Sequence, residues 1–248
     1  MDLKEAPAGQ FVRHPWEVAR CAFVDGIFER YVRVPADGVM LDVGSGDAWL
    51  ASQVVYSRPE IRRCVCWDLG YGDGVDGDAF SDSRLVPLAT APAEEFDVIL
   101  ALDVLEHVED DRAFLERVVR RNMRSGSCMI FSVPAWPALM TSHDDALGHF
   151  RRYTPAQARE AIVKSGLRIE ASGGLFSSLL PVRAAAALRQ CVAGRPDRID
   201  VPRLEWLHSV RLRDMVAAAL LADARCGAWL SRRGLELPGL SWWALCRL

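Results

Sequence analysis

Residues 39–43 form a short apolar run that ends in the turn Gly44-Ser45-Gly46, and a helical stretch at 48–56 follows at once. Strand, glycine turn and helix in this order are typical of the beginning of a parallel α/β unit. In a parallel sheet, ligands bind beyond the carboxyl ends of the strands, where a glycine turn lets the backbone approach and the helix offers N–H groups. A dinucleotide is disfavoured, because the sixth position of the motif is Trp49 and not the third glycine that close helix packing requires.

The remainder of the chain alternates strand-like and helix-like segments. Apolar runs typical of strands recur at 63–67, 85–86, 97–102, 127–133, 167–171 and 242–246. Helical periodicity covers 16–32 and 110–124, and a capping box at Thr154-Pro155-Ala156-Gln157 begins another helix. The pattern predicts an α/β fold: a Rossmann-like, doubly wound, seven-stranded and mostly parallel sheet with an α-helical insertion before the last strand. We expect an N-terminal helical cover at 1–36, a ligand-binding domain at 37–177 and 241–248, and the insertion at 178–240.

Composition excludes several classes of protein. With 50% hydrophobic residues, 25% charged residues and a net charge of −3, the chain resembles neither a disordered nor a nucleic-acid-coating protein. No run of about 18 apolar residues encodes a transmembrane helix, and the first ten residues lack the apolar stretch of a secretory signal. The seven cysteines have no C-x-x-C spacing, so they fit neither a disulfide framework nor a zinc site. We expect a cytoplasmic protein with no nucleic-acid partner.

Two acids stand at the ends of the first two predicted strands. Asp42 lies two residues before Gly44, and Asp68 directly follows the run at 63–67. A carboxylate at the end of the second strand can accept hydrogen bonds from both hydroxyls of a ribose. Capping of the strand end is the alternative role of Asp68. Together, the two acids favour a nucleoside-binding role for the glycine turn over a purely structural role.

Three segments, taken in order, resemble the class I S-adenosylmethionine (SAM)-dependent methyltransferases: 39–48, Asp68 and 96–108. The resemblance covers about residues 36–170 and implies SAM as cofactor and S-adenosylhomocysteine (SAH) as product. It implies that Asp42 helps to hold the methionine amino group, that the glycine turn backs the methionine part, and that Asp68 holds the ribose. The full set of implied cofactor residues is Asp42, Gly44, Ser45, Gly46, Asp68, Leu69, Leu102 and Asp103. Ala48 departs from the family pattern, which usually has a third glycine there, and only Asp78 and Asp82 are candidates for an acidic contact to adenine.

The segment 142–154 follows the fifth predicted strand and concentrates titratable groups at the same sheet edge. It resembles a loop in a methyltransferase subgroup near the ubiquinone-pathway enzymes, similar to type 11 and type 23 methyltransferases. His143 and His149 are candidate general bases, because a histidine can accept a proton at neutral pH, and Asp144 could orient either one. The candidate substrate-binding residues are Arg151, Arg152 and Tyr153. Locking of this loop to the neighbouring helix is an equal alternative for any one of these residues.

No metal is expected in this loop. A cluster of His143, Asp144, Asp145 and His149 is conceivable, but Mg²⁺ prefers carboxylates and water over imidazoles. His107, in the segment that resembles the cofactor-flanking motif, is expected to pack against its own helix rather than to abstract a proton.

The insertion at 178–240 is basic. It contains ten arginines, no lysine and six acids, which gives +4 and leaves −7 for the rest of the chain. Two helices are expected, broken near 194–196, which could pack on the domain, form a lid or a dimer face, cover a lipid-like substrate, or contact the inner membrane face. The expected function is O-methylation of a small-molecule or lipid-linked acceptor. The alternatives are a non-catalytic SAM-binding regulatory protein and a nucleotide-dependent oxidoreductase, and the oligomeric state stays open.

Overall fold

The computed structural model describes residues 12–72, 80–194 and 209–248. Seven strands form one sheet in the order β3-β2-β1-β4-β5-β7-β6. Their bounds are β1 Gly38–Val43, β2 Ile61–Trp67, β3 Leu85–Leu88, β4 Phe96–Leu102, β5 Met123–Pro134, β6 Arg168–Leu175 and β7 Ser241–Arg247. Neighbouring strands are parallel except at β7, which runs antiparallel to β5 and to β6. The predicted Rossmann-like, doubly wound, mostly parallel sheet is confirmed.

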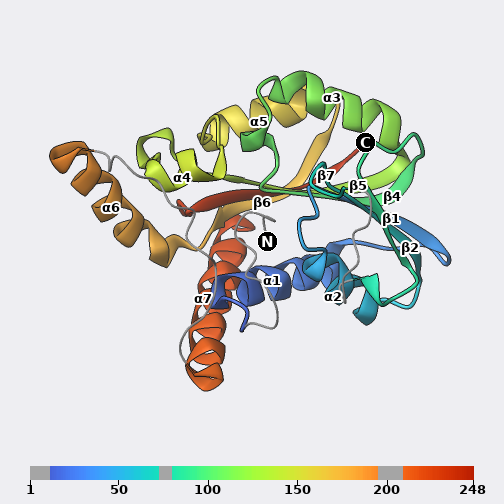
Figure 1. Cartoon of the computed structure of the whole chain (residues 1–248), viewed down its shortest axis with the longest axis horizontal. Helices are drawn as coiled ribbons and strands as arrows, with labels where there is room; N and C mark the ends of the chain where they lie inside the picture. Colours follow the sequence, from blue (N-terminus) through green and yellow to red (C-terminus); the bar gives the residue numbers. More distant parts are fainter. Residues whose placement is uncertain (1–11, 73–79, 195–208) are drawn as a thin grey trace.

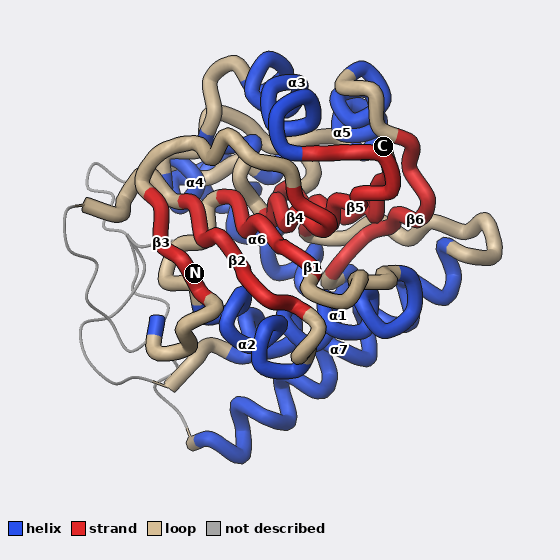
Figure 2. The backbone as a smooth tube through the Cα atoms, turned by 90° about the vertical axis from the view of Figure 1, so that its right-hand side faces the viewer, coloured by secondary structure: helices blue, strands red, loops and turns tan. Residues whose placement is uncertain are grey.

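Helices cover both faces of the sheet (Figure 1). One face carries α3 (Asp111–Asn122) and α5 (Pro155–Lys164), and the other carries α1 (Pro15–Tyr31), α2 (Trp49–Ser57) and α7 (Val210–Ser231). Side chains alternate along a strand, so β1 sends Met40 into the core beside α1 and α2, and Leu41 and Val43 into the core beside α3. Figure 2, turned by 90°, shows the same three layers. Burial on both faces explains why the strands read as nearly continuous apolar runs.

The strand order fixes where a ligand can enter. The chain runs outward from β1 to β2 and β3, and then returns across the sheet to β4 on the other side of β1. The loops that follow β1 and β4 therefore leave in opposite directions, and a crevice opens between them at the carboxyl ends. β1 and β4 are paired neighbours, so Gly44 and Asp103, which follow them, stand at the two sides of this crevice.

The two helices of the predicted insertion have different environments. α7 packs against α1 and contributes Leu220, Ala224 and Ala228 to the core cluster. α6 (Leu180–Ala193) has no buried residue and extends away from the sheet (Figure 1). The predicted break near 194–196 lies mostly outside the described residues. Among the described helices, none combines the length and the apolar character needed to cross a membrane.

Candidate active site

A cavity of about 510 Å³ opens at the carboxyl ends of β1, β2 and β4. Its lining includes Val43 and Gly44 after β1, Asp68 after β2, and Leu102 and Asp103 after β4. Because the three strands are parallel neighbours, residues far apart in the sequence meet at this edge. The volume lies within the range of about 300–1,000 Å³ that small-molecule sites occupy.

Gly44 brings the backbone to the cavity without a side chain. Its φ of +63° is in the left-handed region, and a Cβ at this position would lie 2.9 Å from Val104 Cγ2. Both facts explain why the turn needs glycine here. Ala48, where the resemblance expects a glycine, keeps a left-handed φ of 55° and is fully buried. The chain thus retains the glycine-like conformation at Ala48, at a cost of about 1–2 kcal/mol.

Asp68 presents an oriented carboxylate to the cavity. Its Oδ2 accepts a hydrogen bond from the Gly46 amide at 2.9 Å, and its Oδ1 accepts one from the Gly70 amide at 2.8 Å. Each carboxylate oxygen has a second acceptor position, so the pair can also bind two ligand hydroxyls. Leu69, the next residue, lines the same cavity and is 83% exposed.

Asp42, Ser45 and Gly46 do not appear among the described residues that line the cavity. Ser45 and Gly46 belong to the glycine turn, which Tyr71 holds in place. The Tyr71 hydroxyl donates to the Gly46 carbonyl at 2.6 Å and lies 2.9 Å from Ser45 Oγ. Burial raises the pKa of Asp42 to about 7. Tyr71 is therefore a support of the site that sequence reasoning missed.

The two acids considered for an adenine contact gain no such role. Asp82 accepts a hydrogen bond from Arg84 Nη2 at 2.7 Å and is not among the described residues of the cavity lining. Asp78 lies outside the described residues. No acidic residue is therefore assigned to the adenine side.

The N-terminal helix α1 supplies one wall of the cavity, which its periodicity did not reveal. Trp16 and Arg20 line the cavity, and the Arg20 guanidinium lies 4.7 Å from the centre of the Trp16 ring. Arg20 also forms an ion pair with Asp103, whose Oδ1 accepts a hydrogen bond from Ser132 Oγ at 2.9 Å. The cover helix thus fixes a side chain that follows β4.

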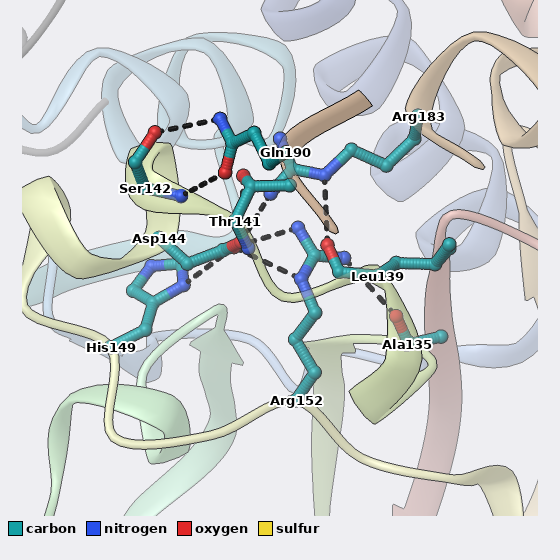
Figure 3. Close-up of polar contacts among 9 residues, drawn as sticks. All are labelled: Ala135, Leu139, Thr141, Ser142, Asp144, His149, Arg152, Arg183 and Gln190. Carbon is teal, nitrogen blue, oxygen red and sulfur yellow. Dashed lines mark hydrogen bonds and ion pairs between the residues drawn. The ribbon is translucent and has the colours of Figure 1, made fainter. Parts of the chain in front are cut away.

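The loop after β5 folds into the short helix α4 (Ser142–Leu147), which the sequence did not predict, and buries Asp144 completely at the cavity wall. Arg152 donates to Asp144 Oδ1 from Nε at 3.0 Å and from Nη2 at 2.7 Å, and Arg183 of α6 forms an ion pair with Oδ2 (Figure 3). His149 Nδ1 lies 3.2 Å from Oδ1. Burial by itself raises the pKa of Asp144, but the hydrogen bonds from His149 and Arg152 and the charges of both arginines outweigh it and lower the pKa below its usual value. Asp144 is therefore an ionised acceptor, and His149 Nδ1 carries the proton between them.

Both histidines proposed as general bases line the cavity. His149 Nδ1 lies 3.2 Å from Asp144 Oδ1, so Nε2 is the ring nitrogen available to a bound ligand. Burial lowers the pKa of His143, and the nearby charge of Arg183 lowers it further, so this imidazole is neutral at neutral pH. Each ring can therefore accept a proton from a bound ligand.

The three residues expected to bind substrate lie in different places. Arg152 lines the cavity, whereas Arg151 and Tyr153 are not among the described residues of its lining. The Tyr153 hydroxyl donates to Asp111 at 2.6 Å, and Arg151 donates to the Glu109 carbonyl at 2.7 Å. These contacts tie the loop to the beginning of α3, which is the loop-locking role held open for them.

Glu106 is the site candidate that sequence reasoning passed over. It lies in the 3-10 turn Leu105–His107, is fully buried and lines the cavity. Neither of its carboxylate oxygens has a hydrogen-bond partner among the described residues. Burial raises the pKa of Glu106 well above its usual value. The adjacent pair Glu106-His107 after β4 could have been noticed in the sequence as a candidate site. The approach of His149 to this pair could not, because it depends on the fold.

No protein-family model and no curated protein matches the sequence. Solved structures do match. Mycolic acid cyclopropane synthase CmaA1, complexed with SAH and CTAB, gives a TM-score of 0.55 at 14% identity over 99% of this chain and 92% of that chain. The cyclase SpnF gives 0.53 at 14% identity over 98% and 86%, and an S-adenosylmethionine-dependent methyltransferase from Mesorhizobium loti gives 0.50 at 14% over 94% and 97%. At such identities the likeness concerns the fold alone: this chain has the seven-stranded, mostly parallel, Rossmann-like fold of these solved structures.

Proposed function

We propose that this protein is a SAM-dependent methyltransferase that methylates an oxygen atom of a small-molecule or lipid-linked acceptor. The observation that carries the proposal is the meeting of Gly44, the Asp68 carboxylate and two histidines in one cavity. The donor set fits SAM: Asp68 can accept bonds from the ribose hydroxyls, and Gly44 presents bare backbone to the cavity beside the methionine part. Bound there, SAM supplies a methyl group on a sulfonium.

The residues of the chain have to align the acceptor and take its proton. Methyl transfer is an in-line displacement, so positioning supplies much of the rate. An alcohol or phenol also has to lose its proton, and His143 and the Nε2 atom of His149 are the two groups that can accept it. Asp144 orients His149 by accepting its Nδ1 proton.

The charge of the wall supports an acceptor with an anionic group. Arg152 and Arg183 share the single carboxylate of Asp144, so positive charge is in excess there. Guanidinium groups bind phosphate and carboxylate well. A phosphate-bearing or carboxylate-bearing acceptor would therefore be attracted to this side of the cavity.

α6 supports a lipid-linked acceptor. It carries Arg183, which lines the cavity. It also carries three exposed apolar side chains, Val182, Leu188 and Val192, whose exposed fractions are 70%, 65% and 81%. Apolar side chains beside an arginine suit the boundary between lipid chains and their headgroups. Peripheral contact of a cytoplasmic protein with the inner membrane face, through α6, is therefore part of the proposal.

Calorimetry with SAH and with NADH tests the cofactor. We expect SAH to bind and NADH not to bind. Asp68→Asn should weaken the affinity for SAH by about tenfold or more, because charge-assisted hydrogen bonds to the ribose are lost. Asp82→Asn is the matched control, because Asp82, like Asp68, accepts the backbone amide two residues further on, but it is paired with Arg84 and is not among the described residues of the cavity lining. Binding of NADH without SAH would establish the oxidoreductase instead.

A methyl-donor assay against pooled phenols, sugars and lipid extracts tests the transfer. His143→Asn and His149→Asn should reduce turnover and leave SAH affinity within a few fold. A protein that binds SAH and labels no pool would be a SAM-binding regulatory protein, a role that the fold also permits, since one of its structural neighbours is by name a cyclase.

A further inference from the structure

We propose that Glu106, His107 and His149 bind one divalent transition-metal ion at the wall of the cavity. One ligand atom from each of the three residues lies within 4.8 Å of the others, which is close enough for small side-chain rotations to bring all three onto one cation. Glu106 and His107 stand after β4, and His149 arrives from the loop after α4. All three residues line the cavity.

The carboxylate of Glu106 is the second and independent observation. The residue is 0% exposed, and both of its oxygens are buried without a hydrogen-bond partner among the described residues. A buried carboxyl group in that condition is costly for a fold to keep. A cation bound to Glu106 removes this cost, because it supplies the opposite charge and the missing partner together.

The orientation of His149 is what a metal ligand requires. Metal-binding histidines usually donate their second ring nitrogen to a carboxylate, which fixes the tautomer and the direction of the ring. His149 Nδ1 lies 3.2 Å from Asp144 Oδ1, so Nε2 is the ring nitrogen left to bind a cation. The ring of His107 lies 4.6 Å from that of His149, centre to centre, at an interplanar angle of 88°.

The ligand set selects the class of metal. Two imidazoles and one carboxylate suit Zn²⁺, Fe²⁺ or Co²⁺, whereas Mg²⁺ prefers an all-oxygen shell. Three protein ligands also leave coordination positions that face the cavity. If the proposed function holds, an acceptor oxygen would bind in one of these positions and lose its proton more readily. Because Nε2 of His149 would then bind the metal, His143 at the same cavity would be the histidine that takes this proton. The metal site would thus select acceptors with an oxygen donor.

Titration of the metal-free, full-length protein with Co²⁺, followed by visible absorption, tests the site. We expect one Co²⁺ per chain in the wild type and a loss of affinity of at least about tenfold in Glu106→Gln and in His149→Asn. His143→Asn is the matched control, because it removes a histidine of the same cavity outside the three ligands, and it should keep Co²⁺ affinity within a few fold.

Two results would overturn the metal site: no Co²⁺ binding by the wild type, or wild-type affinity in Glu106→Gln. Circular dichroism of each variant separates loss of a ligand from loss of the fold, and Glu106→Gln conserves shape. Calorimetry with SAH on the same samples separates this inference from the proposed function. Binding of SAH without Co²⁺ overturns the metal site alone, whereas binding of Co²⁺ without SAH supports the metal site and overturns the methyltransferase.

Discussion

Replacement of Asp144 by asparagine should destabilise the protein by about 3–5 kcal/mol, the usual effect of removing one partner of a buried ion pair. The carboxylate is fully buried and receives both Arg152 and Arg183, and it also accepts the Thr141 amide at 2.7 Å as part of a capping box. The asparagine amide keeps the shape but leaves two arginines facing a neutral group. The free energy of unfolding of an ordinary domain is about 5–15 kcal/mol, so this loss would be a large fraction of the total stability.

The pH dependence of the unfolding free energy is a second test of the role of Asp144. The folded-state pKa of Asp144 is below its unfolded value of 3.8. A depressed carboxyl pKa stabilises the fold above the unfolded pKa, and this stabilisation is lost as the pH falls through and below 3.8. The wild type should therefore lose stability on acidification more steeply than Asp144→Asn.

Urea unfolding at pH 7 and in steps down to pH 3 measures both effects. Asp145→Asn is the matched control, because the neighbouring acid in the first turn of α4 is only half-buried and carries the same formal charge. We expect it to change the unfolding free energy by less than about 1 kcal/mol. A change as small as this in Asp144→Asn, or an unchanged acid slope, would refute the reasoning about the buried network.

Three further predictions follow from individual side chains. Gly44→Ala should cost at least about 1–2 kcal/mol, because its φ is +63° and Val104 lies 2.9 Å from the new Cβ, while Gly72→Ala, with open space around it, should be nearly neutral in urea unfolding. The pKa of Asp42 is about 7 in the folded state and 3.8 in the unfolded state, so the wild type should lose up to about 4 kcal/mol of stability as the pH rises from 3.8 through 7. Asp42→Asn should abolish this pH dependence, and an equal slope in the variant would contradict the prediction. Aspartates introduced together at Leu188 and Val192 should reduce sedimentation with anionic lipid vesicles and leave SAH affinity unchanged, and equal sedimentation would exclude membrane contact through α6.

The elements of the fold could be predicted because their signals are local. Continuous apolar runs, helical stripes and the capping box at Thr154 depend on neighbours within a few residues, and the structure has the capping box with Thr154 and Gln157 bonded to each other. The principal local miss is α4, a six-residue helix too short to show a periodic stripe. The strand ends also follow from the pattern, since parallel order brings Gly44, Asp68 and Asp103 to one edge.

Which of these residues meet each other was decided by the tertiary structure. The sequence does not distinguish the roles of Arg151, Arg152 and Tyr153. In the fold, Arg152 contacts Asp144, Tyr153 contacts α3, and Arg151 contacts the segment before α3. Arg183 reaches Asp144 from α6, and Arg20 reaches Asp103 from α1, across 39 and 83 positions of sequence.

The sequence by itself thus determined the type of sheet and the edge at which the cavity opens, because backbone preferences and apolar runs act over a few residues. The tertiary structure alone decided the wall of that cavity: the buried network around Asp144, the cover from α1, and the approach of His149 to Glu106 and His107. Burial, ion pairing and the lack of a hydrogen-bond partner are properties of neighbours in space, and no local pattern in the sequence encodes them.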